Sequence, residues 1–319
     1  MASKQSIAFS YQYLISFDSV VVFCHCFGMI NLTLLKRSKV LFLGICALSA
    51  PLLAVGCEGC KPLELEREPP ASAGYMDSSV EANTLFNETW AALASKQGGE
   101  ENIHFPKKIL WLTGAPGAGK GYHSPAIMEY SGITSEPIVT SDLLRKPEFM
   151  ERINSGLLIN DRVVVEELFN TLMEPGYQAG CIIDGFPRTM VQAEIVTLLY
   201  EKLKDRGVAF YVILLDVNED LSVERQLSRG RKAVEHNKRV QETGVGELIT
   251  VRATDVDETY ARKRFEIFLE QSYSAFEVMR KQFPFNDIDA SAPEAEIKEA
   301  IRKEVLWQEG LNAGYAARN

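Results

Sequence analysis

A glycine-rich segment that ends in lysine carries the clearest chemical signal in the sequence. Its residues are Gly114, Ala115, Pro116, Gly117, Ala118, Gly119 and Lys120, and Gly121 and Tyr122 follow. The spacing GxxxxGK lies between an apolar run at 107–112 and a helical pattern, which is the strand–loop–helix context of a P-loop. In such a loop, backbone N–H groups surround phosphate oxygens at a helix N-terminus, and the lysine adds a positive charge. The segment therefore predicts a phosphate-binding site.

Arginines and one acidic segment supply the other candidate groups. Asp184-Gly185-Phe186-Pro187-Arg188-Thr189 follows the apolar run 181–183. A guanidinium group suits phosphate because its planar donors can meet two oxygens at once. Formal net charge over the 319 residues is −9, so the composition excludes a generally basic surface for nucleic acid. Local arginines must then bind any phosphates, as in a site for small anions.

The elements that would position these residues alternate from residue 107 onward. Apolar runs typical of buried strands occupy 107–112, 181–183 and 208–216, with a shorter one near 285–289 and helical patterns between them. We therefore expect an α/β fold of the P-loop NTPase class. The four apolar runs would be strands of one sheet covered by helices.

Four motifs in order along the chain resemble the adenylate kinase family. They are Gly-Ala-Pro-Gly-Ala-Gly-Lys-Gly at 114–121, Thr-Ser-Asp-Leu-Leu-Arg at 140–145, Asp-Gly-Phe-Pro-Arg-Thr at 184–189 and Arg-Ala-Thr-Asp at 252–255. The resemblance covers about 107–305 and implies three layers, α/β/α, around a five-stranded parallel sheet. It implies a small insert that binds the nucleoside monophosphate at about 134–174 and a lid at about 229–253. The implied activity is phosphoryl transfer from ATP to AMP, which gives two ADP.

The resemblance also implies a role for each site residue. Lys120, Arg188, Arg229, Arg252 and Arg264 would surround the transferred group, although Lys263 could replace Arg264 because one residue appears inserted there. ATP would bind to residues 114–122 and Arg225. AMP would bind to Thr140, Arg145, Gly185, Arg188 and Gln192. Asp184 would hold Mg²⁺ through water. The partners would be these small nucleotides, and we expect a monomer.

Two departures from the family keep other functions open. Tyr122 stands where the family has Thr or Ser, and Thr254 replaces the first aspartate of the lid-closing Arg-x-Asp-Asp. A kinase for UMP or CMP is one alternative, which Thr140 opposes. A non-catalytic nucleotide-binding module tethered to a membrane is the other. The intact Lys120, Asp184 and Arg188 oppose the second alternative.

The first hundred residues have a different composition. Residues 1–56 form an N-terminal extension in which basic residues at 36–39 precede an apolar run at 40–56, the pattern of a secretory signal. Cys57 directly after it resembles the acylated cysteine of a bacterial lipoprotein, which would anchor the protein to a membrane. A transmembrane anchor or a cytoplasmic kinase with a mis-assigned start is the alternative. A need for ATP argues against export.

Residues 57–105 have the composition of a linker that contains one helix, and 106–319 form the kinase domain. The helix is predicted at Ser79–Gln97, with Ser79 as its cap and Val80, Thr84, Leu85, Trp90 and Leu93 on one face, and we expect it to pack on the kinase domain. Five of the six cysteines lie in the first sixty residues, and the predicted lid has none. We therefore expect no structural zinc.

Overall fold

The computed structural model describes residues 11–17, 20–26 and 75–316. It divides the chain into two compact units, Met1–Glu68 and Pro69–Asn319. In the first unit, strands β1 (Tyr11–Phe17) and β2 (Val20–Cys26) pair antiparallel, which the sequence did not predict. The predicted signal and Cys57 lie outside the described residues. Within the described ranges no helix combines the length and apolar character needed to cross a membrane.

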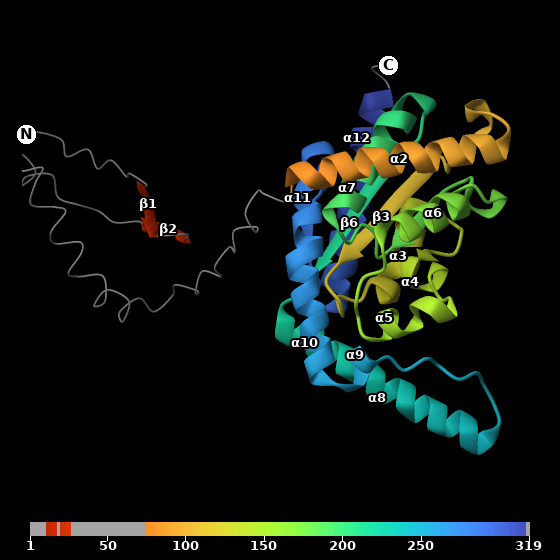
Figure 1. Cartoon of the computed structure of the whole chain (residues 1–319). Coiled ribbons are helices and arrows are strands. Elements are labelled where there is room, and N and C mark those ends of the chain that lie inside the picture. The colour runs from red at the N-terminus through yellow and green to blue at the C-terminus, as the bar shows by residue number, and fades with distance from the viewer. Residues whose placement is uncertain (1–10, 18–19, 27–74, 317–319) are drawn as a thin grey trace, which may run out of the picture. The chain divides into compact units, whose positions relative to one another are not determined.

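A five-stranded sheet forms the centre of the second unit (Figure 1). Its strands are β3 (Lys108–Gly114), β4 (Ile138–Val139), β5 (Cys181–Asp184), β6 (Ala209–Asp216) and β7 (Asp287–Asp289). The spatial order is β4-β5-β3-β6-β7, and all four pairings are parallel. This confirms the predicted parallel sheet.

Helices connect these strands. The larger ones are α2 (Tyr75–Gln97), α3 (Lys120–Ser131), α6 (Asp161–Leu172), α7 (Met190–Leu203), α8 (Glu219–Thr243), α10 (Glu258–Ile267), α11 (Tyr273–Gln282) and α12 (Glu294–Ala316). The short ones are α4 (Thr140–Leu143), α5 (Met150–Asn154) and α9 (Ala253–Val256). The 3₁₀ turns are η4 (Glu100–Asn102), η5 (Pro147–Phe149), η6 (Pro175–Tyr177) and η7 (Lys204–Arg206). A π-helical segment, η8 (Phe268–Ser272), joins α10 to α11 without a break.

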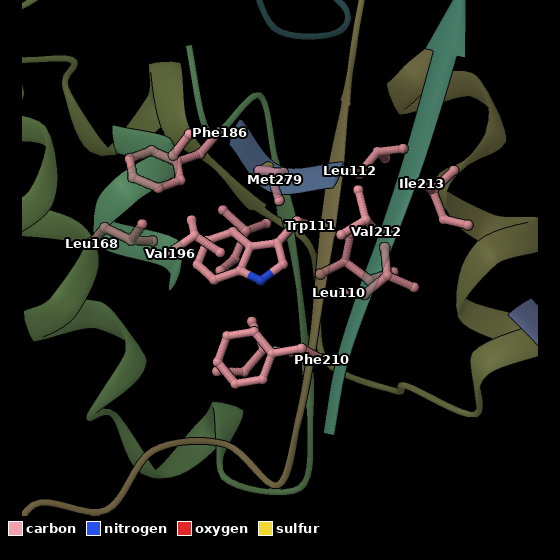
Figure 2. Close-up of a cluster of buried hydrophobic side chains, with 14 of the residues drawn as sticks. Leu110, Trp111, Leu112, Leu168, Phe186, Val196, Phe210, Val212, Ile213 and Met279 are labelled. Carbon is pink, nitrogen blue, oxygen red and sulfur yellow. The ribbon is translucent and has the colours of Figure 1, made fainter. Parts of the chain in front are cut away.

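The helices cover the sheet in two layers. Helices α3 and α12 pack against each other and against β3 and β6, whereas α7 packs against α2 and α11. Side chains alternate across a strand. In β3, Trp111 therefore points to the layer that contains Val196 of α7 and Met279 of α11, while Leu110 and Leu112 point away from it (Figure 2). The result is the three-layer α/β/α architecture expected from the sequence.

Trp111 lies at the centre of the core. Its ring centroid is 5.5 Å from that of Phe186 and 6.1 Å from that of Phe210, and its side chain is fully buried. Phe186 belongs to the same segment as Arg188, so the core fixes the backbone from which that arginine extends. Aromatic pairs of this kind contribute about 0.5–1.5 kcal/mol beyond the area that they bury.

Helix α2 is part of the second compact unit. Trp90 stacks between Phe86 and Phe105, at centroid distances of 5.6 and 5.8 Å, and the Lys202 ammonium of α7 lies 5.2 Å from its ring. The helix begins at Tyr75, four residues before the predicted cap, Ser79. Two residues of its predicted buried face are exposed. Val80 and Thr84 point to solvent because the buried face instead follows Ala82, Leu85, Phe86, Thr89, Trp90 and Leu93.

The predicted lid begins inside a long helix. Helix α8 continues unbroken through Arg229 and Gly230 to Thr243, where Gly244 in a left-handed conformation ends it. The chain returns as an extended segment along α8. Asn237 holds that segment because its side chain both donates to the Ile249 carbonyl and accepts from the Ile249 N–H, each at 2.7 Å.

Candidate active site

The P-loop joins β3 to α3 in a conformation that needs its glycines. Gly114 has φ +129°, and a Cβ there would lie 1.9 Å from the Leu215 carbonyl oxygen. Gly117 has φ +73°, and a Cβ there would lie 2.7 Å from the carbonyl oxygen of Ser222. The Ser222 hydroxyl also donates to the Pro116 carbonyl at 2.7 Å. The loop therefore lies tight against β6 and α8, with the N-terminus of α3 at its end.

Lys120 folds over this loop. Its ammonium donates to the carbonyl oxygens of Gly114 and Ala115, at 2.8 and 2.9 Å. Burial lowers its pKa from 10.5 to about 8, and although Asp184 opposes the shift, Arg188 and Arg264 add to it. Lys120 is therefore a buried ammonium group with one carboxylate and several guanidinium groups near it.

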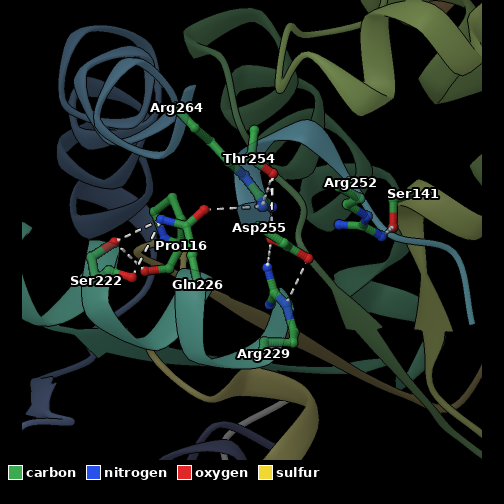
Figure 3. Close-up of polar contacts among 9 residues, drawn as sticks. All are labelled: Pro116, Ser141, Ser222, Gln226, Arg229, Arg252, Thr254, Asp255 and Arg264. Atoms are coloured by element: carbon green, nitrogen blue, oxygen red, sulfur yellow. Dashed lines mark hydrogen bonds and ion pairs between the residues drawn. The ribbon is translucent and has the colours of Figure 1, made fainter. Parts of the chain in front are cut away.

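Three arginines converge on the same space. Arg188 donates from Nε to the Gly185 carbonyl at 2.6 Å. Figure 3 shows the other two, in which Arg252 donates from Nη2 to the Ser141 hydroxyl at 3.4 Å and Arg264 from Nη1 to Gln226 Oε1 at 3.3 Å. Burial is the main cause that lowers the pKa of all three, and neighbouring arginines add to it, while Asp184 opposes the shift at Arg188 and Asp255 opposes it at Arg252 and Arg264. Partners that are mostly neutral leave the charges uncompensated, so the site is complementary to an anion.

Arg264 and Lys263 differ sharply in position. Arg264 lines the cleft, where Nη1 also lies 3.5 Å from Thr254 Oγ1. Lys263 is exposed and pairs with Glu266 at 2.7 Å. Arg264 therefore occupies the position in the cleft that the sequence left undecided between the two.

Arg229 is held by a carboxylate. Its Nε donates to Asp255 Oδ2 at 3.0 Å and its Nη2 to Asp255 Oδ1 at 2.5 Å, a bidentate pair between α8 and α9 (Figure 3). The Asp255 backbone passes so close to Gly230 that a Cβ there would lie 1.7 Å from the Asp255 carbonyl oxygen. This contact fixes the base of the lid.

The cleft and a smaller pocket share these arginines. The cleft, of about 830 Å³, runs from the P-loop past Asp184 to Arg225 and Glu294. A second pocket, of about 40 Å³, is lined by Thr140, Gln192 and apolar residues of 144–164. Arg188, Arg252 and Arg264 line both. Two anionic ligands, one in each pocket, would thus meet at the same three guanidinium groups.

Only some of the residues predicted to bind AMP lie at the cleft and the smaller pocket. Thr140 is buried and donates to the Asp184 carbonyl at 2.9 Å, and Gln192 is buried beside it. A Cβ at Gly185 would lie 2.6 Å from Arg188 Nη2, so glycine makes room for that guanidinium. Arg145 is different: it pairs with Asp142 at 2.9 Å, is half-exposed, and lines neither pocket.

The far end of the cleft contains two of the residues predicted to bind ATP. Arg225 donates from Nη1 to the Ala290 carbonyl at 2.9 Å. Tyr122 is 65% exposed, and its hydroxyl donates to Glu294 Oε2 at 2.7 Å. The phenol oxygen therefore contacts the first turn of α12. It does not turn back over the P-loop, where the family has the hydroxyl of a Thr or Ser side chain.

Asp184 fits a magnesium role. It ends β5, lines the cleft and is partly buried; burial raises its pKa, while Lys120 and Arg188 pull it down. Mg²⁺ is usually held by one or two carboxylates together with waters and substrate phosphates. A single carboxylate beside a phosphate-binding loop is such a donor set. The described residues contain no cluster of three or more His, Cys, Asp or Glu for a metal held by protein alone.

Sequence reasoning missed several residues that shape the cleft. His123 is buried beside the P-loop with no hydrogen-bond partner for Nδ1 in the described part of the chain, and burial lowers its pKa. Ser272, in the π-helical segment, donates to the Arg188 carbonyl at 2.9 Å. Ser222 and Gln226 also face this region. Only the π-helical interruption marks Ser272, and it is visible only in the structure.

The fold and the site define a P-loop phosphotransferase. The sequence model of the family described as adenylate kinase matches residues 112–283, more than half of the chain. The chain therefore belongs to the adenylate kinase family and is a nucleoside monophosphate kinase.

Two proteins similar in sequence are adenylate kinases, and one solved structure is similar in part. An adenylate kinase of Trichodesmium erythraeum is 28% identical over 210 residues, which is 62% of this chain and 97% of the relative. An adenylate kinase of Chlamydia caviae is 36% identical over 127 residues, 37% of this chain and 58% of that relative. A gluconokinase structure from Sinorhizobium meliloti is similar with a TM-score of 0.38 and 18% identity, covering 65% of this chain and 97% of that one.

Proposed function

We propose that this kinase transfers the terminal phosphoryl group of ATP to AMP, with Mg²⁺, to give two ADP. The observation that carries the proposal is the pair of pockets that share Arg188, Arg252 and Arg264. The larger contains the P-loop and suits a triphosphate. The smaller places Thr140 and Gln192 beside these arginines, and at about 40 Å³ it must open further to admit a nucleoside monophosphate. A phosphoryl group passing between two nucleotides would move through the space that the three arginines surround.

The residues of this chain would act mainly by position and charge. Lys120 and the backbone of residues 114–121 would hold the donor phosphates, and the three arginines would stabilise charge on the transferred group and on the acceptor phosphate. Asp184 would hold Mg²⁺ through water, and that ion would neutralise charge on the donor phosphates. A nucleophile or general base from the protein is not required, because the acceptor phosphate itself attacks.

Adenine is favoured as the acceptor base by Thr140 and Gln192. Both are buried at the small pocket, and Gln192 presents an amide, which can both donate and accept hydrogen bonds. The larger cleft is open at Tyr122, where the donor base and sugar can extend from the P-loop toward Arg225. On this proposal ATP would bind in the cleft and AMP at the smaller pocket.

The test uses the purified full chain with MgATP and AMP, UMP, CMP or GMP in turn. We expect ADP to accumulate with AMP, and expect Lys120→Ala to abolish it. Lys303→Ala is the matched control, since this lysine is 71% exposed on α12, and it should retain full activity. Turnover with a pyrimidine monophosphate alone would reassign the acceptor. Nucleotide binding without product from any acceptor would support a non-catalytic module instead.

We also propose, from the signal pattern at 36–57 alone, that Cys57 is acylated and anchors the protein to a membrane. Labelling with a radioactive fatty acid in bacterial cells tests this. The label should appear in the parent protein and vanish in Cys57→Ser. Unlabelled parent protein, or equal label in both, would leave the cytoplasm as the favoured location.

A further inference from the structure

Gln192 is held in a single amide orientation. Its Oε1 accepts from the Arg188 backbone N–H at 2.7 Å, and its Nε2 donates to Asp161 Oδ1 at 2.7 Å. A backbone N–H can only donate, and an ionised carboxylate can only accept. A Gln192 amide turned by 180° would place donor against donor and acceptor against acceptor. The two partners therefore assign the oxygen and the nitrogen without ambiguity.

Asp161 also binds the segment that carries Gln192. The Thr189 hydroxyl accepts from the Gln192 backbone N–H at 3.1 Å, so its own hydrogen is free to donate to Asp161, whose oxygens lie 3.0 and 3.1 Å away. Asp161 begins α6, and Thr189 caps α7. One carboxylate thus connects α6, from the acceptor side, to the N-terminus of α7. Ser272 completes the support by holding the Arg188 carbonyl.

The locked amide still has hydrogen-bonding capacity. Gln192 keeps one N–H and one oxygen lone pair beyond the contacts to Arg188 and Asp161. Its side chain borders the small pocket together with Thr140 and Arg188, and Arg188 would fix the phosphate end of the ligand. A nucleotide whose phosphate is held by Arg188 would present the edge of its base to the Gln192 amide in one position. If the Gln192 oxygen faces the substituent at purine position 6, the pocket favours an amino group. If the Gln192 N–H faces it, the pocket favours an oxo group.

We infer that Asp161 is a positioning residue for acceptor specificity: by fixing the Gln192 amide, it makes the pocket distinguish a 6-amino purine from a 6-oxo purine. The inference rests on the proposed function, because it assumes that the acceptor base enters the small pocket. It concerns Asp161 acting through Gln192, since Asp161 does not itself line that pocket.

The experiment compares equilibrium binding of AMP and IMP, two monophosphates that differ at position 6 by amino against oxo. Dissociation constants are measured by titration calorimetry on the full chain. For the parent protein we expect AMP to bind about tenfold or more tightly than IMP, which is the discrimination given by one well-placed amide pair. In Asp161→Asn the AMP to IMP ratio should fall toward one, because the charged acceptor of Gln192 Nε2 is replaced by an amide that can also donate, which leaves the Arg188 N–H as the only constraint on the Gln192 orientation.

The matched control is Glu166→Gln on the same helix. Glu166 is half-exposed and pairs only weakly with Arg162, at 3.6 Å, so this variant removes a carboxylate from α6 without touching Gln192. Its ratio should equal that of the parent. Should Asp161→Asn melt below the assay temperature, Asp161→Ser is measured in its place. A purely structural role would weaken both ligands equally and leave the ratio unchanged.

The outcomes separate this inference from the proposed function. Turnover of AMP tests the proposed function, whereas the ratio of dissociation constants tests Asp161. If the parent protein binds either AMP or IMP more tightly and Asp161→Asn loses this preference, the inference is supported. A parent without preference, or a preference retained in a folded Asp161→Asn, overturns it, whatever the turnover is.

Discussion

Arg229 and Asp255 form a bidentate ion pair between α8 and α9, at 3.0 and 2.5 Å. Asp255 is buried, whereas the Arg229 side chain is 49% exposed. The pair fixes the base of the lid and neutralises one arginine of the cleft. Arg229 would have to exchange this partner, or share it, in order to contact a phosphate.

Loss of this pair should cost stability. We expect Asp255→Asn to lower the free energy of unfolding by about 1–3 kcal/mol, because a buried acceptor for two N–H donors is weakened. Glu235→Gln breaks a comparable but exposed pair with Arg239 on the same helix, at 3.5 Å, and should cost under about 1 kcal/mol. Urea titrations of the two variants measure the difference. Equal losses in the free energy of unfolding would show that the pair at the lid base stabilises the protein no more than the exposed pair does.

Arg264 should matter far more than its neighbour. Removing one charged donor from a preorganised site commonly costs about 10²–10³ in kcat. We therefore expect Arg264→Ala to lose activity on that scale, and expect Lys263→Ala, which only breaks the exposed pair with Glu266, to stay within about threefold of the parent. Steady-state kinetics with saturating ATP and AMP decide this. A large loss in Lys263→Ala would mean that the lysine enters the cleft.

Lys120 should make ATP binding depend on pH. Its pKa in the empty folded protein is about 8, and a bound phosphate favours the ammonium form. ATP affinity should therefore be level below pH 8 and decrease above it, as the empty site loses its proton. Lys120→Arg keeps the charge and should remove this decrease. Titrations of ATP binding between pH 7 and pH 9.5 measure it, and a flat profile in the parent would contradict the lowered pKa.

The same shift has the opposite effect on stability. The pKa of Lys120 is lower in the folded protein than in the unfolded chain, where it is near 10.5. Between these values the unfolded chain binds more protons, so the contribution of Lys120 to the free energy of unfolding rises with pH from about 8 to 10.5. Comparison of parent and Lys120→Met in urea titrations at pH 7.5 and 9.5 isolates this contribution. A gain in the parent that is absent from the variant is the expected result.

Tyr122 should be separable from phosphate binding. Its hydroxyl donates to Glu294, so Tyr122→Phe should leave the Michaelis constant for ATP nearly unchanged. Tyr122→Thr places a short hydroxyl near the P-loop and should lower that constant by several-fold. Initial rates at varied ATP test both variants. A marked rise in Tyr122→Phe would show that the phenol oxygen leaves Glu294 to contact the donor.

Helix α2 should contribute substantially to folding. Trp90 is 6% exposed and lies between two aromatic rings, so Trp90→Ala should lower the free energy of unfolding by about 3–5 kcal/mol. Val80→Ala on the same helix removes a side chain that is 66% exposed and should change it by less than about 0.5 kcal/mol. Thermal and urea unfolding measure both. Equal, small effects would mean that α2 is dispensable.

Local patterns in the sequence were sufficient for four strands of the sheet and for the P-loop, whereas β4, Ile138–Val139, was not located by any local pattern. The strand at β3, the glycine loop and Lys120 are contiguous, and β6 is a continuous apolar run, so period and order along the chain identified them. The family then followed from motifs of four to eight residues. Helix α2 was recognised as a helix, and Leu85, Trp90 and Leu93 are buried as predicted, but Val80 and Thr84, which were assigned to the same face, are exposed.

Only the tertiary structure decided which charged groups meet. Lys263 and Arg264 are adjacent in sequence, and a helical turn of about 100° per residue sends one to solvent and the other into the cleft. Asp161 and Gln192 are 31 positions apart, and no local pattern predicts their hydrogen bond. The chain itself determined what each segment can form and which chemistry it can supply. The partner of each side chain depended on how helices pack on the sheet, because contacts between distant segments arise only after folding.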